Sequence, residues 1–239
     1  MLPDYNFLSA PPWLINLLHW ITLTLHFAAM NFVLGGVIIM LFGKLENKWQ
    51  HPVVQRFLKL FPTVMAATVT FGVAPLLFVQ LTYHRQVYSA SIISGWFWLM
   101  IIPVVIVVYY LLYATAFRKP DRAGDGPSTL LWIGLAGMLY VALVYSSVFS
   151  LAESPDAMKA LYATDQSGLA LNPEVGSYIL RWLHMILGAV TVGGFWVGWI
   201  GSDNERAYAV GRTFLLYGMI GASLLGIAYL LMLDSALKP

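Results

Sequence analysis

The sequence contains no cysteine among its 239 residues. Covalent attachment of haem needs a Cys-x-x-Cys-His run, iron–sulfur clusters need thiolate ligands, and disulfides need pairs of cysteines. The absence of cysteine excludes all three of these features.

Charged residues are also scarce. They make up 10% of the chain, whereas hydrophobic residues make up 59% and the mean hydropathy is +0.74. Soluble domains carry about 25% charged residues. The net charge is only +2, and the basic residues are spread over short connections, which argues against nucleic-acid binding. The composition therefore indicates a protein of the lipid bilayer.

Long uncharged stretches occur six times, and each is long enough to cross about 30 Å of hydrocarbon as a helix. We predict an all-α integral membrane protein with one transmembrane domain over residues 1–239 and no separate soluble domain. The predicted spans are about 13–43, 60–83, 92–117, 128–150, 177–201 and 213–233.

The basic residues predict the orientation of these spans. Cytoplasmic loops carry an excess of Lys and Arg. That rule is satisfied if the N-terminus lies outside, and both termini are then predicted to be outside. The inner segments would hold Lys44, Lys48, Arg56, Lys59, Arg118, Lys119, Arg122, Arg206 and Arg212, and the outer ones Arg85, Lys159, Arg181 and Lys238. We expect the first apolar stretch to be a retained helix, because no basic segment precedes it.

Four of the five histidines lie in or at the ends of these spans: His19, His26, His84 and His184. An ionisable side chain in hydrocarbon is costly and indicates a functional site. His19 and His26 are seven residues apart on one helix face, at depths of about 10 and 20 Å from the outer boundary, and His184 lies about 10 Å deep. His84 is predicted at the outer surface. We therefore expect the histidines to gather toward the outer side.

Imidazole is a good axial ligand for haem iron, and the propionates of haem seek basic groups or water. Arg85 and Arg181 stand at the outer ends of their spans, where propionates would emerge. Two haems stacked across the membrane would need histidines about fourteen residues apart on one helix. The spacing of seven instead favours haems clustered toward the outer side over one haem in each leaflet.

Structural roles for the histidines remain open alternatives. His84, beside Arg85, could be a solvated residue of the interface, as could His51 in an inner connection. His19 could hydrogen-bond Asn16 or a neighbouring helix without any cofactor.

Two further patterns bear on packing and on the outer surface. Gly194 and Gly198, with Gly218, Ala222 and Gly226 on the last span, have the spacing of close helix packing within or between subunits.

Residues 84–91 are predicted as a short outer connection. The longer outer segment 151–176 contains a helix-like amphipathic piece around Ala157–Tyr162, and it could cap a site or contact a partner.

Three segments carry a resemblance to a known family. The run Thr22-Leu-Thr-Leu-His26-Phe and the stretch from Phe71-Gly-Val-Ala to Gln80 resemble the first two helices of cytochrome bd oxidase subunit I. Asn172-Pro173 followed by Trp182-Leu-His184-Met-Ile-Leu-Gly-Ala-Val-Thr191 is similar to the segment that binds low-spin b haem in that family. The resemblance implies a bd-like four-helix bundle with two further helices. It also implies that His26 and His184 are axial ligands of haem iron, with His19 or His84 as candidates for second ligands.

The sequence also departs from that family. The family's second and third helices carry glutamates that serve its oxygen site, whereas Leu76–Gln80 and Ser94–Tyr113 contain none. The resemblance therefore implies a diverged, b-type haem-binding subunit of a bd-like respiratory complex in the bacterial cytoplasmic membrane. It would pass electrons from quinol or a cytochrome to oxygen or another acceptor. Its expected partners are other membrane subunits, including a second bd-like subunit, and an extracytoplasmic cytochrome. No catalytic residue is assigned.

Two other functions remain open. One is the haem b anchor of a quinol dehydrogenase, in which Tyr83-His84-Arg85 contacts a quinone headgroup and electrons leave to an extracytoplasmic partner. The other is a haem-free scaffold or assembly subunit, in which the glycine faces pack against catalytic partners and the histidines join helices.

Overall fold

The computed structural model describes residues 10–118 and 126–232, and within these ranges it is all-helical with no β-strand. Six helical stretches are long and apolar enough to span a membrane, which confirms that part of the prediction. They are α1 (Pro12–Phe42), α2 (Pro52–Thr82), α4 with α5 (Gly95–Leu99 and Ile101–Phe117), α6 (Ser128–Ala152), α8 (Val175–Ile200) and α9 (Glu205–Met232).

Two of these helices begin earlier than the apolar pattern predicts. Helix α2 starts at Pro52 and α9 at Glu205, so the charged residues Arg56, Lys59 and Arg206 lie within their first eight residues. The 31 residues of α2 extend about 46 Å, more than the thickness of the hydrocarbon layer. The charged turns can therefore lie at the level of the lipid headgroups.

The remaining helices are short. The prediction of a helical piece around Ala157–Tyr162 is confirmed by α7 (Pro155–Thr164). The expected short connection at 84–91 is wrong, because α3 (His84–Ile93) occupies it, and no glycine or proline interrupts that stretch. A 3₁₀ turn, η1 (Lys48–Gln50), precedes α2.

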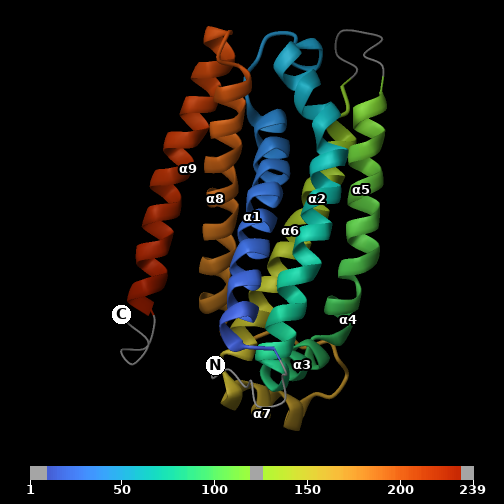
Figure 1. The fold of residues 1–239 in the computed structure, drawn as a ribbon, viewed down its shortest axis with the longest axis vertical. Coiled ribbons are helices and arrows are strands. Elements are labelled where there is room, and N and C mark those ends of the chain that lie inside the picture. The colour runs from blue at the N-terminus through green and yellow to red at the C-terminus, as the bar shows by residue number, and fades with distance from the viewer. Residues whose placement is uncertain (1–9, 119–125, 233–239) are drawn as a thin grey trace.

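Helices α1 and α2 form one antiparallel pair, and α8 and α9 form another (Figure 1). Helix α1 also packs on α8, α5 lies beside α2 and α6, and α6 contacts α8. Helix α1 begins and α9 ends at the end of the bundle where α3 and α7 lie, which we call the α7 end. The opposite end, here the basic end, holds Lys44, Lys48, Arg56, Lys59, Arg118, Arg206 and Arg212. Lys119, Arg122 and Lys238 lie outside the described residues.

The main core lies in the half of the bundle next to the basic end. All nine residues from Phe32 to Met40 of α1 are buried. Phe32 stacks on Phe57 of α2, with ring centroids 4.9 Å apart, and Phe57 and Phe61 are fully buried. A Cβ atom on Gly35 would lie 1.8 Å from the Ala189 carbonyl oxygen, so α1 and α8 touch there through their backbones.

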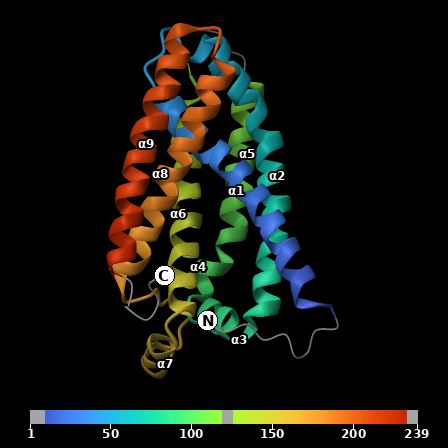
Figure 2. The same cartoon turned by 60° about the vertical axis from the view of Figure 1, so that its left-hand side comes forward.

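A second, smaller core lies at the α7 end. It joins α3, α6 and α7 through residues such as Ile93, Val148, Leu151 and Met158. The first half of α1 and the first half of α8 are not part of it. Those two segments carry His19, His26 and His184, and Figure 2 shows α1 diverging from α8 toward the α7 end.

Candidate functional site in the membrane-spanning region

His26 of α1 lies against the backbone of α2. Its Nδ1 atom is 2.9 Å from the carbonyl oxygen of Thr68. A carbonyl oxygen only accepts hydrogen bonds, so Nδ1 must carry the proton, and Nε2 of the neutral ring keeps a free lone pair. Within the described residues no hydrogen bond to Nε2 of His26 is present. The contact therefore selects the tautomer in which Nε2 can bind a metal.

A glycine makes this close approach possible. Gly72 follows Thr68 by four residues on α2, one turn along the helix. A Cβ atom at Gly72 would lie 2.7 Å from Nδ1 of His26 and 2.8 Å from its Cε1. Any larger residue would push the imidazole away from the carbonyl. The pair Thr68 and Gly72 thus defines where the ring of His26 can lie.

His184 has the same arrangement in the other antiparallel pair. Its Nδ1 is 2.9 Å from the carbonyl oxygen of Ala222 on α9, and Gly226 follows Ala222 by four residues. A Cβ atom at Gly226 would lie 3.2 Å from Cε1 of His184. Two histidines on different helices are therefore held by the same combination of a backbone carbonyl and a glycine. The sequence pattern predicts Gly226 as a packing residue, and its contact with His184 appears only in the structure.

His19 shares a helix face with His26, as expected from their spacing, and both contact α2. The His19 ring meets Phe78 edge-on, with centroids 6.5 Å apart. Its Nδ1 is buried near the Pro75 carbonyl, but within the described residues it makes no hydrogen bond of acceptable geometry. Thr68 and Pro75 are seven residues apart, so α2 matches the spacing of the two histidines on α1.

The four histidines are distributed over three places. His19 and His26 lie between α1 and α2, His184 lies between α8 and α9, and His84 is the first residue of α3 rather than the end of the second span. In the part of the chain that the structure describes, no group of three or more His, Cys, Asp or Glu side chains could hold a metal ion. Haem already contains its iron, and the protein supplies only one or two axial ligands. A single histidine at each place could therefore bind haem.

Arg181 is engaged with protein groups. Its Nη2 atom is 2.7 Å from a carboxylate oxygen of Glu153 at the end of α6, and it also donates to the hydroxyl of Tyr229 on α9. The guanidinium lies over the Tyr229 ring, 5.3 Å from its centroid. This cluster joins α6, α8 and α9 one turn from His184. A propionate at Arg181 would have to share it with Glu153. Arg85 is exposed at the start of α3.

The segment after α7 is fastened to α6 by a buried asparagine. The Asn172 side chain donates to the Ser150 hydroxyl over 2.8 Å, and its backbone N–H donates to the Ser147 hydroxyl over 3.0 Å. In the exposed turn directly after α7, hydrogen bonds from the side chain and backbone of Ser167 lower the pKa of Asp165. Asn172 therefore sets the position from which the chain enters α8 and leads to His184.

Comparison of the chain with known protein families, with curated proteins and with solved structures finds no match. The resemblance to cytochrome bd oxidase rests on the short motifs around His26, Gly72 and His184 alone. What the histidines can do is therefore inferred from their contacts.

Proposed function

We propose that this chain is a b-type haem-binding membrane subunit of a bd-like respiratory electron-transfer complex. The observation that carries the proposal is the shared arrangement of His26 and His184, each of which donates from Nδ1 to a backbone carbonyl beside a glycine. Histidines that bind metals usually donate their other ring N–H to a carbonyl or carboxylate, which fixes the tautomer and the ring orientation.

The first half of α1 carries exposed apolar side chains. On the first half of α1, Trp20, Ile21 and Leu25 are 66%, 48% and 42% exposed, although they point in different directions around the helix. In this region α2 covers the face that carries His19 and His26, and within the described residues the other side chains of this segment, apart from Ile15, are exposed or half-buried. Lipid, a partner subunit or the apolar face of a haem could cover it.

Bound haem would supply one-electron redox chemistry. The chain itself would contribute imidazole ligands at Nε2, hydrogen bonds that make those ligands more basic, and an apolar environment. His19 and His84 are the further candidates for ligation, and Arg85 and Arg181 for contact with propionates. We propose the bacterial cytoplasmic membrane as its location, with both termini outside and with other membrane subunits or an extracytoplasmic cytochrome as partners.

The packing of the glycines argues against the scaffold alternative. Gly194 and Gly198 of α8 contact Gly211 of α9 through their backbones, and Gly218 contacts the backbone of α8 at Thr191. These faces are used within the chain and are not available to a partner. The quinol-dehydrogenase anchor shares the haem with the main proposal and differs in its electron donor and acceptor.

The test is haem quantitation and a reduced-minus-oxidised spectrum of the purified complex, with His26→Ala and His184→Ala variants. Each substitution should remove a b-type absorbance band and lower the haem content. His51→Ala is the matched control, because His51 caps α2 at the basic end by accepting a hydrogen bond from Val53 N–H through Nδ1.

Two outcomes separate the alternatives. No haem in the wild-type complex would sink the proposal and favour the scaffold. Haem that quinol reduces, with electrons passed to an extracytoplasmic acceptor instead of oxygen, would favour the dehydrogenase anchor.

A further inference from the structure

A groove opens at the basic end between α2 and the turn that joins α8 to α9. Its volume is about 680 Å³, and Arg56, Lys59, Leu60, Trp199, Ser202 and Asp203 contribute to its lining. None of His19, His26, His84 and His184 lines it, so any role for it is independent of the haem proposal.

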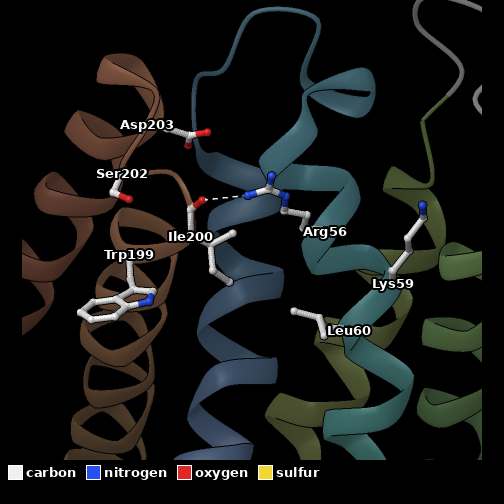
Figure 3. Close-up of a pocket in the computed structure, with 7 residues that line it drawn as sticks. All are labelled: Arg56, Lys59, Leu60, Trp199, Ile200, Ser202 and Asp203. Atoms are coloured by element: carbon white, nitrogen blue, oxygen red, sulfur yellow. Dashed lines mark hydrogen bonds between the residues drawn. The ribbon is translucent and has the colours of Figure 1, made fainter.

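The groove has a polar rim and an apolar lower part. Figure 3 shows Asp203, Ser202 and Arg56 toward the end of the bundle, with Trp199 and Leu60 further along the helices. Arg56 donates to the Ile200 carbonyl over 3.4 Å, which holds its guanidinium across the groove between the two helices. Trp199 and Leu60 are 67% and 40% exposed. Tryptophan prefers the boundary between headgroups and hydrocarbon, so the rim lies at headgroup level.

The rim has cationic groups that no protein carboxylate satisfies. Within the described residues neither Arg56 nor Lys59 forms a salt bridge, although Asp203 lies on the same rim. Arg206 and Arg212 are exposed at the same end of the bundle but do not line the groove. An anion with an apolar attachment would match both parts of the groove.

We propose that the groove binds an anionic phospholipid. Its phosphate would lie at Arg56, which reaches across the groove and would form charge-assisted hydrogen bonds to phosphate oxygens. Lys59, whose amine points away from Arg56 (Figure 3), would add positive charge at headgroup level. Its acyl chains would run along Leu60 and Trp199. Basic pockets between transmembrane helices are suited to anionic headgroups, because each Lys or Arg near the headgroup strengthens binding several-fold. Asp203 opposes the anion and weakens its binding.

The experiment is native mass spectrometry of the purified full-length chain in detergent. Dioleoyl phosphatidylglycerol and dioleoyl phosphatidylcholine are added separately, and the lipid-bound fraction is measured. Phosphatidylglycerol should bind more tightly than phosphatidylcholine, since the two share acyl chains and a phosphate but only the first carries a net negative charge. Arg56→Gln with Lys59→Gln should weaken phosphatidylglycerol binding about tenfold.

Two further variants keep the test specific. Arg118→Gln with Arg212→Gln removes the same charge from the same end outside the groove and should change binding less than twofold. Asp203→Asn should strengthen phosphatidylglycerol binding about threefold, a gain that misfolding cannot produce.

Three results would overturn the proposal. They are equal binding of the two lipids, equal losses in the groove pair and the control pair, and displacement of the lipid by inorganic phosphate at equal concentration. The last result would identify a site for free phosphate and not for a lipid.

Discussion

Helix α1 passes through two different environments. Between Phe32 and Met40 every residue is buried, and Val37 and Ile39 are 0% and 1% exposed. Between Trp13 and Phe27 only Ile15 is buried, although this part of the helix also carries large apolar side chains such as Ile21 and Leu25. The first region is held by side chains and glycines from α2 and α8. The second region lies mainly along α2, which it meets through His19 and His26.

The difference shows that large apolar side chains alone do not make a core in a membrane. Lipid tails are as apolar as leucine, so packing in a bilayer depends on close fit and on polar contacts. The half toward the basic end has close fit, supplied by small residues at the crossing points and by stacked phenylalanines. The other half of α1 contacts α2 through His26, which donates to a backbone carbonyl, and through His19, which meets Phe78. These contacts fix the position of the helix but bury few side chains.

The strongest test of this contrast is at glycines. Gly35→Ala would place a methyl group 1.8 Å from the Ala189 carbonyl oxygen and force α1 away from α8. We expect a loss of about 3 kcal/mol in the free energy of unfolding. Gly188→Ala on α8 has no atom within 4 Å of its new Cβ. It should be neutral or stabilising by up to about 1 kcal/mol, because alanine favours helix. Unfolding in mixed micelles measures both, and equal losses would contradict the contrast.

A smaller difference is expected for aromatic truncation. Phe57→Ala removes a fully buried ring that stacks on Phe32 and meets Phe61. The loss should be about 2 kcal/mol, below the usual cost in water-soluble cores, because lipid-phase association lacks the hydrophobic term. Trp20→Ala, in the open half of α1, should cost less than about 0.5 kcal/mol. The same unfolding assay checks both variants, and a larger effect at Trp20 would show that the open half is packed after all.

The smallest effect on stability, with the clearest effect on spectra, is expected at Gly72. Gly72→Ala gains helix propensity of about 1 kcal/mol and disturbs a hydrogen bond of similar worth, so the net change should be near zero. Under the proposed function, displacement of the His26 ring should shift the reduced haem absorbance band or lower haem occupancy. Gly226→Ala beside His184 should do so less, because its Cβ would be 3.2 Å from the ring, whereas at Gly72 the distance is 2.7 Å. The reverse order would count against these glycines as positioning residues.

Much of this fold follows from the sequence, because uncharged stretches of sufficient length leave few alternatives in a bilayer. Six spans, helix α7 and the shared face of His19 and His26 were all predictable from length and period. The helical nature of α3 was missed, since its mixed composition has no apolar run to reveal it. The partners of His26 and His184 were also out of reach, because the acceptors are backbone carbonyls that every residue possesses. In the sequence, these contacts are marked only by Gly72 and Gly226, which follow the two acceptor residues by four positions.

The position of the dense core has a consequence for biogenesis. Its contacts, from Phe32 and Gly35 to Phe57 and Ala189, involve none of the four histidines in or near the spans. Under the proposed function, a newly made chain would therefore complete this half in the membrane before haem arrives. Loading would then be a late event on a chain whose dense half is already packed, and cells short of haem would accumulate this precursor instead of degradation fragments.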